Sequence, residues 1–168
     1  MAQDDTIIAL RKVLTTETEP LGRRFRALFS LKHFACLQPS TERTLPAIEA
    51  IAAGFSSDSA LLKHELAYCL GQSRNLNSVQ YLQQAVKDSG QDVMCRHEAA
   101  EALGALGDMG SLDTLKGLRD KESEPDVIRE TCDIAVDRIL WENSEERKME
   151  SLRPRYSHSS MSPMRFHI

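Results

Sequence analysis

The sequence ALLKHELAYCLG (60–71) returns further along the chain as VMCRHEAAEALG (93–104). Each copy carries a histidine followed by a glutamate, His64-Glu65 in the first and His97-Glu98 in the second. The apolar positions around these pairs keep the same register in both copies. A repeat of this period is typical of helical hairpins that stack and bury their apolar faces on their neighbours. This duplicated stretch therefore predicts a helical repeat fold.

The spacing between the two copies, which begin at residues 60 and 93, also relates other parts of the sequence on both sides of the duplicated stretch. Three apolar positions before the second copy recur one period later: Val79, Leu82 and Ala85 become Leu112, Leu115 and Leu118. A further unit lies at the N-terminus. Its sequence RFRA (24–27) aligns with RHEA (96–99) if the loop that follows this unit is longer than the other loops. No stretch alternates with the period of two that a strand requires. We predict an all-α protein, an α-solenoid of about four HEAT-like helical hairpins that forms a right-handed superhelical half-ring.

The hairpins have predicted boundaries of about 5–36, 44–71, 77–104 and 110–142, within one HEAT-repeat domain over 1–143. Pro20 and Pro125 suit helix starts, because proline needs no partner for a backbone N–H there. Gly71 suits a helix end. Residues 144–168 are charged and then rich in Ser, Pro and Arg. The charged run to Glu150 would be able to extend the last helix, and the rest is predicted to be a disordered tail or a truncated linker.

The composition excludes several classes of protein. A net charge of −4 over 168 residues argues against a nucleic-acid binder, which usually has a basic face. No apolar run approaches the roughly 18–20 residues that span a membrane, and the first residues are acidic where a signal peptide would be basic. The four cysteines are widely spaced, which favours reduced thiols. We therefore expect a cytoplasmic protein with no nucleic-acid or membrane partner.

A helical wheel separates the histidine from the glutamate in each pair. In the first copy the apolar stripe consists of Leu62, Leu66, Cys69 and Leu70. His64 lies opposite this stripe and Glu65 lies at its flank, so the two side chains are expected to diverge. In stacked hairpins, equivalent positions lie on the order of 8–10 Å apart. His64 and His97 would then be able to lean toward one metal ion.

Two imidazoles leave a metal ion short of ligands. Glu65 and Glu98 are hard oxygen donors, and with histidine they favour iron or manganese over structural zinc. The alternative is a solvated helix face, on which His and Glu are common. Tyr68 and Glu101 lie one turn further along the same face, where they would either support the site or be exposed. Cys95 is expected in the core.

The outer repeats lack the pair. At the same register, the first hairpin has Phe25-Arg26 and the fourth has Glu130-Thr131. We interpret these repeats as caps without the motif.

Four strings carry a resemblance to a known family: RRFRALFSLK (23–32), SDSALLKHELAYCLGQ (57–72), RHEAAEALGALGD (96–108) and IRETCDIAVDRI (128–139). The sequence resembles the N-terminal half of the deoxyhypusine hydroxylases, which are HEAT-repeat iron monooxygenases. The resemblance covers roughly residues 5–150. It implies two facing half-solenoids, each with two His-Glu pairs, and a di-iron centre between them.

The resemblance also implies a site, a substrate and partners. His64, Glu65, His97 and Glu98 would be iron ligands or immediate carboxylate partners of two Fe²⁺ ions in a complete site. The reaction would be O2-dependent hydroxylation of deoxyhypusine on a translation initiation factor, in the cytoplasm and the nucleus. The second half of the family pattern is absent here, so another chain or a C-terminal half would have to complete the site. The alternative is a non-catalytic HEAT-repeat scaffold that binds a partner protein, or an incomplete fragment of the enzyme.

Overall fold

The computed structural model describes residues 4–151, and every regular element in this range is helical. The predicted all-α class is therefore confirmed. The α-helices are α1 (Asp5–Thr15), α2 (Leu21–Ala35), α3 (Thr44–Ala52), α4 (Ala60–Gln72), α5 (Val79–Lys87), α6 (Val93–Leu106), α7 (Leu112–Arg119), α8 (Asp126–Glu142) and α9 (Glu145–Ser151). Short 3-10 turns, Ala53–Ser56, Leu76–Ser78 and Met109–Ser111, lie after α3 and before α5 and α7.

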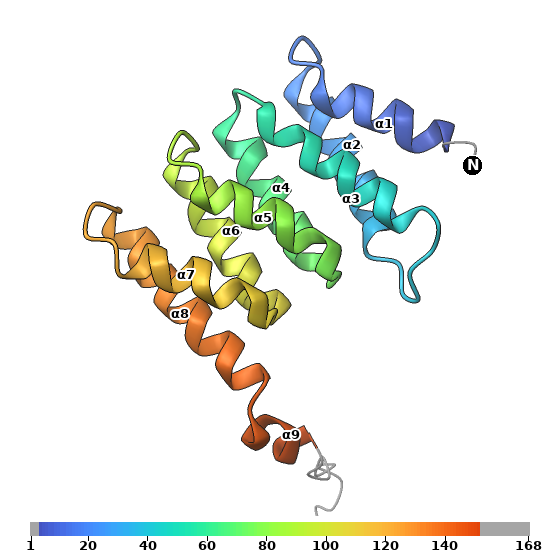
Figure 1. The fold of residues 1–168 in the computed structure, drawn as a ribbon. Helices are drawn as coiled ribbons and strands as arrows, with labels where there is room; N and C mark the ends of the chain where they lie inside the picture. The colour runs from blue at the N-terminus through green and yellow to red at the C-terminus, as the bar shows by residue number, and fades with distance from the viewer. Residues whose placement is uncertain (1–3, 152–168) are drawn as a thin grey trace, which may run out of the picture.

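The first eight helices form four antiparallel pairs that stack in chain order (Figure 1). The first helices of the pairs, α1, α3, α5 and α7, lie in one layer, and the second helices lie in the other. Within the second layer, α2 packs on α4, α4 on α6, and α6 on α8. This is the predicted α-solenoid of about four hairpins. It places the two His-Glu helices, α4 and α6, side by side.

The helix starts follow the capping signals of the sequence. The Ser59 hydroxyl accepts a hydrogen bond from the Leu62 backbone N–H at the start of α4. The Asp92 carboxylate accepts one from the Met94 N–H at the start of α6. Pro20 and Pro125 are the cap residues that precede α2 and α8. The Ser59 and Asp92 oxygens each satisfy a backbone donor that has no partner inside its helix.

Gly71 does not end α4, and this part of the prediction is wrong. The helix runs through Gly71 to Gln72. The glycine serves helix packing instead, because a Cβ built at this position would lie 2.8 Å from the Cβ of Ala102 in α6. Gly104 of α6 has the same relation to Ala135 of α8, at 3.0 Å. The residue that does end a helix is Gly107, which follows α6 with a left-handed φ of 68°.

The same type of arginine contact joins the two helices in three of the hairpins. The Nε of Arg24, Arg96 and Arg129 donates to the backbone carbonyl ten residues earlier, at Leu14, Val86 and Arg119 respectively. These carbonyls lie at or near the C-terminal ends of α1, α5 and α7, where the helix leaves them without an internal partner. The repeated arginine therefore fixes how each of these hairpins closes.

The charged segment after α8 is helical but forms a separate helix. Asn143 caps α8, and the charged residues that follow form the short helix α9. The predicted disordered or linker residues 152–168 lie outside the described residues. None of the helices within 4–151 is both long and apolar enough to cross a membrane.

Candidate metal centre

The two inner second helices bring three of the four predicted ligands together. His64 and Glu65 lie on α4, and Glu98 lies on α6, which packs directly against α4. The Nε2 of His64 lies 3.2 Å from Oε2 of Glu98. Its Nδ1 lies 3.5 Å from Oε1 of Glu65. One imidazole is thus flanked by two carboxylates, one from its own helix and one from the next repeat.

The expected divergence of His64 and Glu65 is wrong. Neighbouring residues on a helix point about 100° apart, but the glutamate side chain is long enough to bend back toward the ring. The solvated-face alternative also describes these positions poorly. His64 and Glu65 are each 27% exposed and Glu98 is 12% exposed, so all three are partly buried between repeats.

His97, the fourth predicted ligand, makes its polar contacts elsewhere. Its Nδ1 lies 2.7 Å from Oγ1 of Thr131 on α8. Its Nε2 lies 3.7 Å from Oε2 of Glu101, one turn further along α6. His64 contacts a residue of the next repeat, and so does His97. In both cases the partner directly follows the equivalent position of that next repeat.

Thr131 is a site residue that the sequence reasoning missed. From its sequence we interpret the fourth hairpin as a cap without the motif, and that interpretation gives Thr131 no part in the site. The Thr131 hydroxyl nevertheless contacts His97, the histidine of the second copy. The available signal is register, because Thr131 occupies in the fourth repeat the place that Glu98 occupies in the third.

Burial shapes the charge state of the site. Burial raises the pKa of the Glu98 carboxyl above its usual value, and the nearby His64 opposes this shift. Glu101 and Glu65 raise it further as like charges. The Nδ1 atom of His64 is itself buried and has no hydrogen-bond partner among the described residues. A buried ring nitrogen without a hydrogen-bond partner, on an imidazole flanked by two carboxylates, is an arrangement that a cation would stabilise.

The donors fit an iron site in type and fall short of one in number. Imidazole nitrogens and carboxylate oxygens are the donors that iron and manganese bind in oxygen-using enzymes. However, no three His, Cys, Asp or Glu side chains within 4–151 are grouped so that they could hold a metal ion by themselves. The described part of this chain therefore presents part of a metal site.

The cysteines of the core do not supply the missing ligands. Cys69, Cys95 and Cys132 are free and buried, as expected of core residues. Burial raises the pKa of Cys69 to about 12 and those of Cys95 and Cys132 to about 11. These thiols stay protonated at neutral pH, whereas a metal binds the thiolate.

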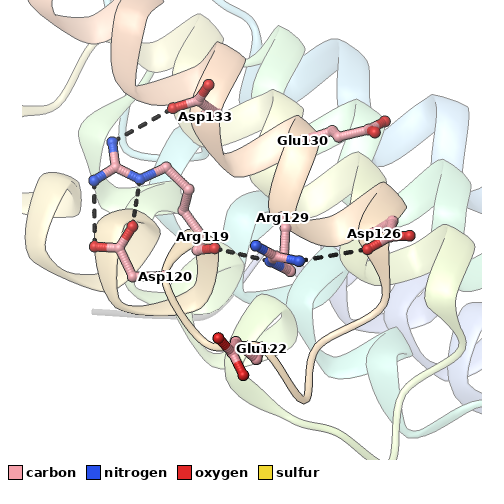
Figure 2. Close-up of a pocket in the computed structure, with 7 residues that line it drawn as sticks. All are labelled: Arg119, Asp120, Glu122, Asp126, Arg129, Glu130 and Asp133. Carbon is pink, nitrogen blue, oxygen red and sulfur yellow. Dashed lines mark hydrogen bonds and ion pairs between the residues drawn. The ribbon is translucent and has the colours of Figure 1, made fainter.

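A separate hollow lies at the last hairpin, between the end of α7 and the start of α8. It measures about 500 Å³ and contains none of the four predicted ligands. Figure 2 shows its arginines already paired, Arg119 with Asp120 and Asp133, and Arg129 with Asp126 and the Arg119 carbonyl. Because these charges satisfy one another, the chemistry points to the α4–α6 interface rather than to this hollow.

The fold and the repeated His-Glu arrangement define a class of protein. The family of HEAT repeats matches residues 45–133, and the chain belongs to this family. Its solenoid of helical pairs is the architecture of that class.

The individual proteins that this chain resembles are deoxyhypusine hydroxylases. The chain is 75% identical over 150 residues to the deoxyhypusine hydroxylase of Aspergillus fumigatus, a match that covers 89% of this chain and 45% of that protein. The enzyme of Aspergillus oryzae is also 75% identical, over 90% of this chain and 44% of that protein. The structure of human deoxyhypusine hydroxylase in complex with glycerol matches with a TM-score of 0.72 and 38% identity, over 89% of this chain and 46% of that one. The chain therefore spans about half the length of the relatives that it matches.

Proposed function

We propose that this chain supplies half of a deoxyhypusine hydroxylase, corresponding to the N-terminal half. The observation that carries the proposal is the cross-repeat contact of His64 with Glu98 in a chain 75% identical to such enzymes. The complete assembly would hydroxylate the deoxyhypusine residue of a translation initiation factor to give hypusine. Two Fe²⁺ ions would be the cofactor, and bound iron would supply the activation of O2.

The residues of this chain have defined parts in that proposal. His64 and His97 would offer imidazole nitrogens to iron, and Glu65 and Glu98 would offer carboxylate oxygens or hold the imidazoles in place. The carboxylates also favour binding of a protonated amine, because opposite charges attract strongly where water is partly excluded. The deoxyhypusine side chain, an aminobutyl-lysine, carries such amines.

Completion of the site requires a second set of ligands. It would come from the other half of a longer chain or from a second copy of this one. We expect the isolated monomer to bind iron weakly or not at all, because the donors that the structure describes do not form a group of three. Native mass and iron content, measured on the same purified sample, test this expectation. Two tightly held irons per monomer would contradict it, and two irons per dimer would favour completion by a second copy.

Activity is tested by adding deoxyhypusine-bearing initiation factor, Fe²⁺ and O2 and measuring hypusine by mass spectrometry. The assay uses the chain alone and the chain mixed with a separately produced C-terminal half of a relative. Replacement of both His64 and His97 by alanine should abolish iron binding and hydroxylation in the complete assembly. His33→Ala is the matched control, because His33 is exposed near the end of α2 and contacts Phe34 instead.

The second candidate is a non-catalytic HEAT scaffold or an incomplete fragment that binds a partner protein. It is favoured by the shortage of grouped metal donors over residues 4–151. A scaffold would keep its partner and its stability after both histidines are replaced, and it would yield no hypusine in any mixture. The compartments, cytoplasm and nucleus, stay predictions from the sequence.

A further inference from the structure

Thr131 occupies a special position in the repeat. It lies in α8 at the register that Glu98 has in α6, and it is 8% exposed. Where the third repeat offers a carboxylate to the histidine before it, the fourth repeat offers a hydroxyl. In a helix a threonine hydroxyl has two favoured χ1 positions, and the position that bonds the carbonyl of the preceding turn fixes its oxygen relative to the helix.

The single proton of the Thr131 hydroxyl is already committed. Oγ1 lies 2.6 Å from the backbone carbonyl oxygen of Val127, one turn earlier in α8. Two oxygens this close repel each other unless a proton lies between them, and a carbonyl has none to give. The hydroxyl proton therefore points to Val127, as threonines in helices commonly do.

This commitment determines the proton on His97. Oγ1 of Thr131 lies 2.7 Å from Nδ1 of His97, and toward that nitrogen it can only accept. The hydrogen of that bond must then come from the ring, so neutral His97 carries its proton on Nδ1. Its Nε2 then carries the lone pair, and the nearest carboxylate, that of the exposed Glu101, lies 3.7 Å away, beyond hydrogen-bond distance.

His64 has a different arrangement. Its Nε2 faces the Glu98 carboxylate at 3.2 Å, and an ionised carboxylate only accepts. The buried Nδ1 of His64 has no hydrogen-bond partner within 4–151 but lies 3.5 Å from the Glu65 carboxylate. A carboxylate thus faces each ring nitrogen of His64, and these contacts do not select one tautomer. Of the two copies of the motif, only the second therefore has its ring proton fixed by a hydroxyl acceptor, although the two sequences are equivalent.

We propose that Thr131 is a positioning residue that holds neutral His97 in the Nδ1–H tautomer and leaves Nε2 as the free nitrogen. The purpose of this arrangement rests on the proposed function, because Nε2 is then the atom that would face a metal. Metal-binding histidines usually donate their other ring N–H to a fixed acceptor, which sets tautomer and ring orientation. The tautomer itself is a property of the metal-free chain.

The experiment records the imidazole nitrogens of the metal-free chain, labelled with ¹⁵N-histidine, by long-range ¹H–¹⁵N correlation. The sample is kept about two pH units above the ordinary imidazole pKa of about 6.5, so that neutral rings are observed. Loss of one set of signals in His97→Gln identifies the ring. In the wild type we expect a protonated Nδ1 and an unprotonated Nε2 at His97.

Two substitutions separate positioning from a general effect on folding. Thr131→Val keeps the shape but removes the acceptor, and should shift His97 to a mixed or Nε2–H population. Thr131→Ser keeps the hydroxyl and should retain the wild-type pattern. His33, which lies on α2 rather than on the helices of the site, should be unchanged in all samples. A wild-type His97 that is mainly Nε2–H, or a Thr131→Val spectrum that matches the wild type, would overturn the proposal.

A second readout keeps this proposal apart from the proposed function. Fe²⁺ affinity is measured for the complete assembly, where Thr131→Val should weaken binding by about 10–100-fold and Thr131→Ser should not. If the Nδ1–H tautomer is observed but the assembly binds no iron, the tautomer assignment stands and the proposed function fails. If the Thr131→Val assembly binds iron with wild-type affinity although its His97 tautomer is mixed, the proposed function stands and the role of Thr131 in preparing His97 for metal binding is overturned.

Discussion

Gly71 of α4 lies against Ala102 of α6 so closely that a Cβ at Gly71 would be 2.8 Å from the Ala102 Cβ. Gly104 and Ala135 repeat this relationship between α6 and α8. The His-Glu pairs lie on α4 and α6, so the glycines help to set how closely the helices of the candidate site approach each other.

We expect Gly71→Ala to lower the free energy of unfolding by about 1–3 kcal/mol, because the added methyl overpacks the contact with Ala102. Urea denaturation measures the change. The matched control is Gly117→Ala in α7, where an added Cβ meets nothing within 4 Å, so the higher helix propensity of alanine should stabilise by about 1 kcal/mol.

Ala102→Gly combined with Gly71→Ala moves the methyl group from one helix to the other. The double variant should lose less stability than the sum of the two single variants, because the overpacking is relieved. Strict additivity would mean that the two residues do not meet in the folded protein.

Glu124→Gln should remove a pH-dependent part of the stability. Hydrogen bonds from Lys121 and from the buried Arg96 hold the pKa of Glu124 below its usual value. A lowered carboxyl pKa stabilises the fold above the unfolded value of about 4.3, and this stabilisation is lost as pH falls through the folded pKa. The variant should be about 1–3 kcal/mol less stable at pH 7.

The test compares urea unfolding of wild type and Glu124→Gln from pH 7 downward, with the exposed Glu122→Gln as control. The difference should shrink once the pH falls below about 4. A difference that is constant with pH would assign the loss to packing rather than to the charge.

Glu98→Gln should separate metal binding from folding. Burial raises the pKa of Glu98, so its charged form is disfavoured in the metal-free fold. The amide should leave the metal-free stability within about 1 kcal/mol of wild type or raise it. In the complete assembly, Fe²⁺ affinity should fall at least about 10-fold.

Calorimetry measures both the stability of the metal-free chain and the Fe²⁺ affinity of the complete assembly. Glu49→Gln is the control, since Glu49 is exposed on α3 rather than on the helices of the site. A Glu98→Gln assembly with unchanged iron affinity would remove Glu98 from the proposed ligands.

Thiol labelling should modify Cys36 first. Cys36 is partly exposed, whereas Cys69, Cys95 and Cys132 are buried and have pKa values of about 11 to 12. Because the thiolate is the reactive form, iodoacetamide at neutral pH should label one site in the folded chain and all four cysteines after denaturation. Peptide mass spectrometry identifies the sites, and early labelling of Cys95 would contradict the packing of α6.

The helical class, the four-hairpin solenoid and the candidate residues follow from the sequence, because a single period repeats both the apolar stripe and the His-Glu pair. The starts of α2 and α8 follow as well, since the restriction that Pro20 and Pro125 impose on the backbone is a local effect. Local sequence does not distinguish a glycine that ends a helix from one that packs against a neighbour, and the prediction for Gly71 is wrong for that reason.

Only the tertiary structure decided which side chains meet. Periodicity specifies the face of a helix, but it does not specify the axial offset and rotation between stacked helices. That offset joins His64 to Glu98 and His97 to Thr131, so equivalent residues of neighbouring repeats do not pair. It also gives Thr131, a residue of a supposed cap, a place at the candidate site. Local sequence determines each helix, whereas the packing between helices determines the chemistry.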